Sequence, residues 1–186
     1  RRGAGRLRPH RCGDVGSRAG RRHPGHRHDG QADGQRHPVA GLVSNNDLVS
    51  DFQSASTYFN TFGGNPVSAA AAMAVLDVLE EEKLQANALT VGDHVRVGLE
   101  RLASRYDVVG GVRGRGLFFG IDLEVDGRPD ADLTKRLVND MRDRGVLLSR
   151  IGRHDNVLKM RPPLVFTIAD ADHLLGTLDD ALGQLG

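Results

Sequence analysis

The 186-residue sequence is poor in several residue types, and each scarcity excludes a class of protein or a structural feature. Its single cysteine, Cys12, excludes a disulfide within the chain, and nothing indicates secretion. No apolar run approaches the ~18 residues that a membrane-spanning helix needs. The start of the sequence carries positive charge but lacks the apolar stretch of a secretory signal. These absences make the cytoplasm the default expectation.

Residues 1–36 lack lysine, glutamate and aromatic side chains. They hold ten arginines and three aspartates, a net charge of +7, whereas the rest of the chain has 15 basic and 21 acidic residues, a net of −6. Too few apolar residues are present to offset the entropy of ordering this segment. We expect residues 1–36 to be a disordered tail and the remainder to fold.

The remainder alternates helical and strand patterns. Asn65 followed by Pro66 is a strong helix start, because asparagine caps free N–H groups and proline loses no needed hydrogen bond there. That helix should run to about Lys83, with one apolar face made by Val67, Ala71, Ala74, Val75 and Val78. A second helix is expected over 87–104, with Val91, Val95, Leu99 and Leu102 as its apolar stripe.

Short strands are expected at 38–43, 108–112, 117–125, 146–149 and 157–160. Leu133, Leu137 and Met141 stripe a third helix. Thr167 and Asp170 fit a capping box that opens a last helix with Leu174, Leu178, Leu182 and Leu185. This order of elements indicates an α/β fold, with helices packed on a small mixed sheet. No Cys/His spacing supports a metal site.

Residues 58–66 read Tyr-Phe-Asn-Thr-Phe-Gly-Gly-Asn-Pro. This segment resembles the cofactor-phosphate segment of the class III aminotransferases, fold-type I enzymes that use pyridoxal phosphate. Residues 112–123 and 155–164 are similar to signatures of the family's small domain, in the family's order and spacing. The second of these reads Asp-Asn-Val-Leu-Lys-Met-Arg-Pro-Pro-Leu. It is most similar to the branch containing ethanolamine-phosphate phospho-lyases and alanine–glyoxylate aminotransferase-2-like proteins.

The resemblance implies a domain organisation and a site. It covers about residues 37–186, and it makes 37–84 the end of the cofactor-binding large domain and 85–186 the C-terminal small α/β domain. Thr61, Phe62 and Gly63 would bind the cofactor phosphate, since a hydroxyl and N–H groups beside glycines can approach an anion closely. Arg161 would bind the substrate α-carboxylate through its planar guanidinium.

The resemblance also implies partners. In the family the matching threonine reaches the cofactor bound by the other subunit, so a homodimer is expected. The small molecules would be an amino donor and a keto acceptor.

Simpler interpretations stand beside these assignments. The Gly-Gly segment alone is also typical of a turn before a capped helix, and Arg161 could be an ordinary arginine at a strand end. Arg113 and Arg115 are better explained as solvated or structural residues, and His154 and His173 as surface residues.

Catalysis with pyridoxal phosphate needs a Schiff-base lysine, an acid at the pyridine nitrogen and a phosphate site. Only the phosphate segment is visible. No lysine precedes Lys83, and neither it, Lys135 nor Lys159 has the family's context. The chain as written should therefore be inactive alone, and no catalytic lysine is assigned.

Another reading frame through residues 1–36 permits segments similar to the family's aspartate and lysine segments. Our hypothesis is that 1–36 is an out-of-frame translation, which makes the chain a fragment of an aminotransferase. A genuine basic tail is the alternative.

Three other functions compete with an aminotransferase. One is a phospho-lyase of a phosphorylated amine that uses the same cofactor. Another is a non-catalytic nucleic-acid-binding protein with the basic tail as an electrostatic arm, which is disfavoured because the tail has no aromatic residue for base stacking. The third is a silent partner that lends Thr61 to an intact subunit.

Overall fold

The computed structural model describes residues 26–29 and 37–185. The chain divides into two compact units, Arg1–Glu82 and Lys83–Gly186. Every residue of the hydrophobic core that the structure describes belongs to the second unit.

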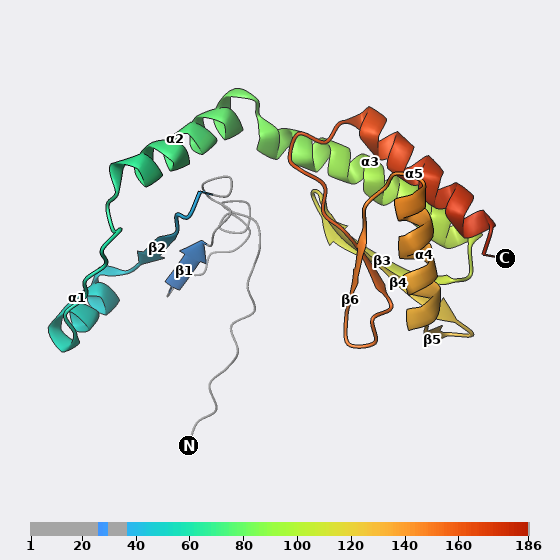
Figure 1. Cartoon of the computed structure of the whole chain (residues 1–186), viewed down its shortest axis with the longest axis horizontal. Coiled ribbons are helices and arrows are strands. Elements are labelled where there is room, and N and C mark those ends of the chain that lie inside the picture. The colour runs from blue at the N-terminus through green and yellow to red at the C-terminus, as the bar shows by residue number, and fades with distance from the viewer. Residues whose placement is uncertain (1–25, 30–36, 186) are drawn as a thin grey trace, which may run out of the picture. The chain divides into compact units, whose positions relative to one another are not determined.

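The first unit holds two strands and two helices (Figure 1). Strand β1 (His26–Asp29) pairs antiparallel with β2 (Gly41–Ser44). Helix α1 (Asn46–Ala55) begins after Asn45, whose side chain accepts a hydrogen bond from the main-chain N–H of Leu48. Helix α2 (Pro66–Glu81) follows a turn at residues 61–64. Neither helix contains a buried residue within the described part of the chain.

Two expectations for this unit need correction. The sequence predicts disorder throughout 1–36, yet residues 26–29 form β1; strand pairing uses main-chain groups, so a polar, arginine-rich segment can also pair. Residues 1–25 and 30–36 lie outside the described residues. The strand predicted at 38–43 begins later, at Gly41, because proline at position 38 has no N–H to donate to a ladder.

The predicted start of α2 is confirmed. The side chain of Asn65 accepts hydrogen bonds from the main-chain N–H groups of Val67 and Ser68, and Pro66 is the first helical residue. The helix ends at Glu81, close to the expected end, because Lys83 adopts a left-handed conformation with φ 51°. The predicted apolar face exists but is not buried within the described part of the chain: Val67 is 66% and Val78 43% exposed.

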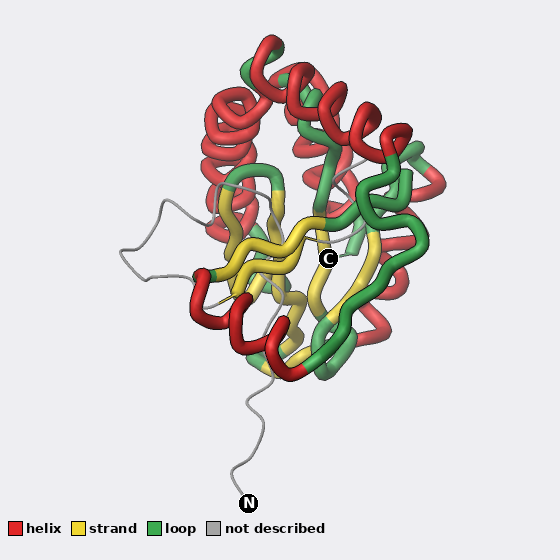
Figure 2. Tube along the Cα trace, turned by 90° about the vertical axis from the view of Figure 1, so that its left-hand side faces the viewer, coloured by secondary structure: helices red, strands yellow, loops and turns green. Residues whose placement is uncertain are grey.

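The second unit is a layer of helices on one antiparallel sheet (Figures 1 and 2). Its helices are α3 (Leu84–Arg105), α4 (Ala131–Asp143) and α5 (Ile168–Gly183). Its strands are β3 (Val109–Arg115), β4 (Phe118–Val125), β5 (Arg128–Pro129), β6 (Ser149–Ile151) and β7 (Val157–Met160). The strand order is β3-β4-β7-β6, and β5 pairs with the end of β4.

The expectation of a mixed sheet is wrong, because every strand pair in the described residues is antiparallel. Strands β3 and β4 form one hairpin, and β6 and β7 form another. Strand β7 pairs with both β4 and β6, so these two run in the same direction with β7 between them. Helix α4 therefore crosses from β4 to β6 without creating a parallel pair.

The predicted apolar stripes form the core of this unit. Alternate residues of β4, namely Phe119, Ile121 and Leu123, are at most 2% exposed. They pack with the predicted faces of the helices, in a cluster that includes Val91, Val95, Leu99, Leu102, Leu133, Leu137, Met141, Leu158, Met160, Leu174, Leu178 and Leu182. Leu185 packs at its edge. The period-two and helical patterns thus locate the core correctly.

The capping box of α5 is present, and it predicts that the stability of the fold depends on pH. The Asp170 carboxylate accepts hydrogen bonds from the hydroxyl and then the N–H of Thr167, and these lower the pKa of Asp170 below its ordinary value. A lowered carboxyl pKa contributes stability above about pH 4, and this contribution is lost as the pH falls through the folded-state pKa.

Carboxyl groups titrate at about pH 3 to pH 5. We therefore expect the melting temperature of the wild-type chain to fall more between about pH 5 and pH 3 than that of Asp170→Asn. Thermal melts monitored by circular dichroism across that range measure the difference. Asp132→Asn, an exposed aspartate on α4, is the control and should keep the wild-type pH dependence. Identical pH profiles for wild type and Asp170→Asn would contradict the prediction.

Candidate functional site

The turn at residues 61–64 is organised by Asn60. The side-chain Oδ1 of Asn60 accepts a hydrogen bond from the N–H of Phe62 at 3.0 Å, and its carbonyl accepts one from Gly63 at 3.1 Å. Its Nδ2 donates to the hydroxyl of Tyr58 at 3.1 Å. Tyr58 in turn contacts Phe52 of α1 edge to face, with 6.1 Å between ring centroids. One asparagine thereby fixes the turn and links it to the preceding helix.

Thr61 is the residue of this turn whose hydrogen-bond donors are free among the described residues. It is exposed, and no described residue accepts a hydrogen bond from its hydroxyl or its N–H. The N–H groups of Phe62 and Gly63 are donated to Asn60, so these two residues shape the turn. A Cβ on Gly63 would approach the Asn60 carbonyl to 3.2 Å, which explains the small residue there. The arrangement leaves Thr61 able to donate to an anion.

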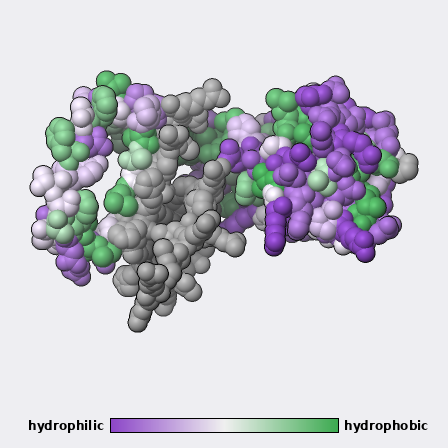
Figure 3. Space-filling view, turned by 60° about the horizontal axis from the view of Figure 1, so that its bottom comes forward, coloured by the Kyte–Doolittle hydropathy of each residue, from purple (hydrophilic) through white to green (hydrophobic). Residues whose placement is uncertain are grey.

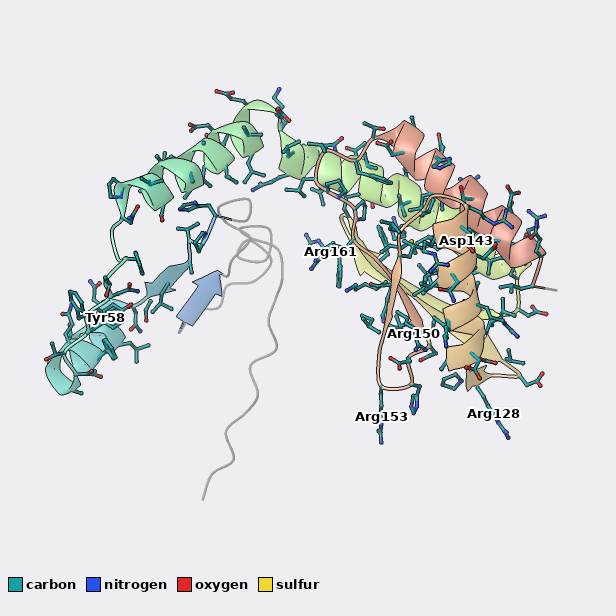
Figure 4. The ribbon with its side chains drawn as sticks, viewed as in Figure 1. Tyr58, Arg128, Asp143, Arg150, Arg153 and Arg161 are labelled. Atoms are coloured by element: carbon teal, nitrogen blue, oxygen red, sulfur yellow. The ribbon has the colours of Figure 1, made fainter. Side chains whose placement is uncertain are left out.

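Arg161 directly follows β7 and is exposed. Figure 4 shows its side chain extending away from the sheet. It makes no hydrogen bond or ion pair with any described residue, although several other arginines of this unit do. Arg113 pairs with Asp122, and Arg150 donates to the carbonyl of Ala131 at 3.3 Å. A guanidinium without partners at a fixed strand end is available to a carboxylate or phosphate.

A hollow of about 240 Å³ opens on the sheet face opposite the helices. It is mostly apolar, and it is lined by Arg113, Gly114, Phe118, Phe119, Gly120, Ile151, Gly152 and Val157. The hydrogen bond from Arg113 to Asp122 raises the pKa of the guanidinium. The side chain of Arg113 is paired with Asp122, and the other residues that line the hollow carry no charge.

Apolar residues lie exposed over the helices of the first unit. They include Leu48, Val49 and Phe52 of α1, and Val67, Met73, Leu76 and Val78 of α2. Figure 3 shows hydrophobic surface on this unit and a visible face of the second unit that is largely hydrophilic. An alanine-rich helix without a buried side chain is unusual, because such helices normally lie in a protein interior.

The three lysines are spread over the second unit. Lys83 precedes α3, Lys135 is exposed on α4, and Lys159 is half-buried on β7, where it lies opposite Gly120. No described helix is long and apolar enough to cross a membrane. Within residues 26–29 and 37–185, no group of three or more His, Cys, Asp or Glu side chains is placed to hold a metal ion.

A family model, aminotransferase class-III, matches residues 29–182. The chain belongs to the class III aminotransferase family. It is 38% identical over 155 residues to alanine–glyoxylate aminotransferase 2 homolog 2, mitochondrial, of Arabidopsis thaliana, covering 82% of this chain and 32% of that protein. It is 34% identical over 157 residues to ethanolamine-phosphate phospho-lyase homolog 1 of Caenorhabditis elegans, covering 82% and 34%. The class III chain thus spans about a third of the length of these relatives.

Solved structures of the family agree with this fold. A phospholyase from Arthrobacter in complex with phosphoethanolamine superposes with a TM-score of 0.88 at 49% identity, covering 92% of this chain and 41% of that one. An amine transaminase from an uncultivated Pseudomonas species, in its PLP-bound form, gives a TM-score of 0.77 at 30% identity, covering 88% and 39%. The fold-type I α/β expectation is confirmed.

Family membership implies pyridoxal phosphate as cofactor. The free donors of Thr61 suit the phosphate of that group. The sequence analysis did not identify Asn60 as the residue that organises this turn. The Asn-Thr pair inside the motif was the one local signal for Asn60.

Proposed function

We propose that this class III chain supplies two anion contacts of a pyridoxal-phosphate-dependent enzyme. Thr61 contacts the cofactor phosphate, and Arg161 holds the anionic group of a small amino acid or amine. The observation that carries the proposal is the guanidinium of Arg161 at the end of β7, which has no partner among the described residues. Arginine binds carboxylates and phosphates through two parallel hydrogen bonds, which fixes orientation as well as charge.

The bound cofactor would supply an electron sink for chemistry at the amine-bearing carbon. The residues of this chain bind and orient: Thr61 donates its hydroxyl and N–H, with Phe62 and Gly63 shaping the turn, and Arg161 sets the direction of the substrate. We propose transamination as the reaction of the intact family enzyme, and no turnover by this chain alone, since the catalytic lysine has no counterpart in it.

The arrangement of the wider enzyme is part of the proposal. We assign 37–84 to the end of the large domain and 85–186 to the small domain. A second subunit would receive Thr61 in a homodimer, and the cytoplasm is the proposed location. The exposed apolar residues of α1 and α2 support a larger assembly, because such surfaces mark contacts with other protein parts.

Elimination of phosphate is the second candidate. The Arthrobacter phospholyase, solved with phosphoethanolamine, is 49% identical over 92% of this chain. In this case the substrate would be a small phosphorylated amine, and Arg161 would hold its phosphate rather than a carboxylate.

These contacts can be tested without turnover by using stable adducts of the cofactor and an amine, in which the imine bond has been reduced. We expect the 186-residue chain to bind N-(5′-phosphopyridoxyl)-L-alanine about tenfold more tightly than the ethylamine adduct, which lacks the carboxylate (about 1.4 kcal/mol). Arg161→Ala should abolish this preference, and Thr61→Ala should weaken both adducts alike. Titrations that follow the fluorescence of the adducts measure the affinities.

Arg153→Ala is the matched control, because Arg153 is an exposed arginine of the same unit and has no partner among the described residues (Figure 4). It should leave the preference unchanged. Tighter binding of the phosphoethanolamine adduct, lost in Arg161→Ala, would favour the phospho-lyase. A carboxylate preference that survives Arg161→Ala would refute the assigned role of Arg161.

A further inference from the structure

The segment that follows Arg161 has few attachments of its own. Residues 161–167 belong to no helix or strand, and Pro162 and Pro163 have no main-chain N–H to donate. Its internal hydrogen bond runs from the N–H of Phe166 to the carbonyl of Pro163 at 3.0 Å. The segment then enters the capping box at Thr167. Phe166 packs against the hydrophobic core near the end of the segment, and the path between Arg161 and that point depends on contacts with another element.

Asn87 makes that contact. It lies in the first turn of α3 and is half-buried. Its Nδ2 donates to the carbonyl of Leu164 at 2.8 Å and to the carbonyl of Phe166 at 3.0 Å. Both amide hydrogens are thus used on two carbonyls of one short segment, 77 and 79 residues further along the chain. In a strand, these carbonyls would accept hydrogen bonds from a neighbouring strand; here the side chain of Asn87 donates them instead.

We propose that Asn87 is a positioning residue for Arg161. It ties the segment after Arg161 to α3, while Met160, which precedes Arg161, is fixed opposite Phe119 in the sheet. Arg161 is thereby held between two anchored points, with the rigid Pro162-Pro163 pair on one side. The inference rests on the proposed function of Arg161, because the anchoring matters to a ligand only if that guanidinium binds its anionic group.

A merely structural role for Asn87 makes a different prediction, and α3 offers a matched control. Near the other end of the helix, the Tyr106 hydroxyl lies 3.1 Å from the carbonyl and 2.5 Å from the carboxylate of Asp179. Tyr106→Phe removes two polar contacts between α3 and the C-terminal part of the unit, as Asn87→Ala does. It leaves the Arg161 segment untouched.

The test uses the full chain and the alanine and ethylamine adducts of phosphopyridoxyl. Their ratio of dissociation constants reports the carboxylate contact alone, because they share every other group. Asn87→Ala and Asn87→Asp should each reduce this ratio from about ten to about two, since an ångström-scale misplacement removes most of a bidentate contact. Asn87→Asp is nearly isosteric but cannot donate to the two carbonyls. Tyr106→Phe should keep the wild-type ratio, with all variants confirmed as folded by circular dichroism.

Three outcomes would overturn the inference, and they can be told apart. Asn87 variants that are folded and keep the wild-type ratio show that Asn87 does not position Arg161. A Tyr106→Phe variant with an equal loss shows that general loosening of α3 is responsible. If Arg161→Ala itself keeps the ratio, the proposed function fails and the inference fails with it.

Discussion

Replacing Gly92 with alanine is expected to lower the free energy of unfolding of the second unit by about 3 kcal/mol. Gly92 is buried in α3, where the helix meets the β3–β4 turn. A Cβ at this position would overlap the carbonyl group and the Cα of Gly116, the latter at 2.8 Å. Alanine is normally the better helix former, by ~1 kcal/mol over glycine, so the steric conflict must reverse the intrinsic preference.

The conflict cannot be relieved by a side-chain rotation, because the overlapped atoms are main chain. Gly116 itself has φ 55°, a left-handed conformation that the β3–β4 turn requires. Moving the turn would shift Leu117 and Phe119, which lie in the core. Either α3 or the hairpin must be displaced.

Gly176→Ala is the matched control, since Gly176 lies in α5 and a Cβ there would meet nothing within 4 Å. Its free energy of unfolding should rise by about 0.5–1 kcal/mol. Urea unfolding followed by circular dichroism compares the two variants. A Gly92→Ala protein as stable as Gly176→Ala would show that α3 does not pack this closely on the turn.

Phe119→Ala is expected to cost about 3–5 kcal/mol, whereas Phe118→Ala should cost less than ~1 kcal/mol. The two residues are neighbours in β4 but lie on opposite faces of the sheet. Phe119 is 2% exposed and packs among the helices, whereas Phe118 is 40% exposed at the hollow on the other face. Removal of Phe119 leaves a cavity in the core, and removal of Phe118 mainly alters the surface.

Chemical denaturation of the two variants under identical conditions gives the comparison. The change in midpoint should be several times larger for Phe119→Ala, with similar slopes for both proteins. Equal losses would contradict the assigned faces of β4. They would mean that the open face of the sheet contributes as much to stability as the helix-covered face.

Local patterns in the sequence predict the elements well where the pattern is strong. The alternation from Leu117 to Val125 locates β4, and Asn65-Pro66 locates the start of α2. The strand expected at 146–149 forms instead at 149–151. Gly145 ends α4 with φ 88°, and Leu147 is 83% exposed, so the apolar run there is part of a connection.

The arrangement of the strands depends on information that local patterns do not carry. Whether β6 pairs with β4 or with β7 is decided by tertiary packing, so the antiparallel order could not be read from the sequence. The same applies to Asn87, because a single asparagine in a helix gives no indication of carbonyls 77 residues away. The roles of Thr61 and Arg161 came from the motifs around them and stay proposals.

The topology of the second unit also bears on its synthesis in the cell. The central pair β4–β7 joins Phe119 to Met160, and α5, which completes the core with Leu178 and Leu182, is the last helix of the unit. An isolated two-stranded hairpin is only marginally stable in water. Helix α3 precedes the β3–β4 hairpin and packs on its apolar face, but the core lacks Leu178 and Leu182 until α5 has been synthesised, so we expect the core of this unit to close only after α5 has left the ribosome.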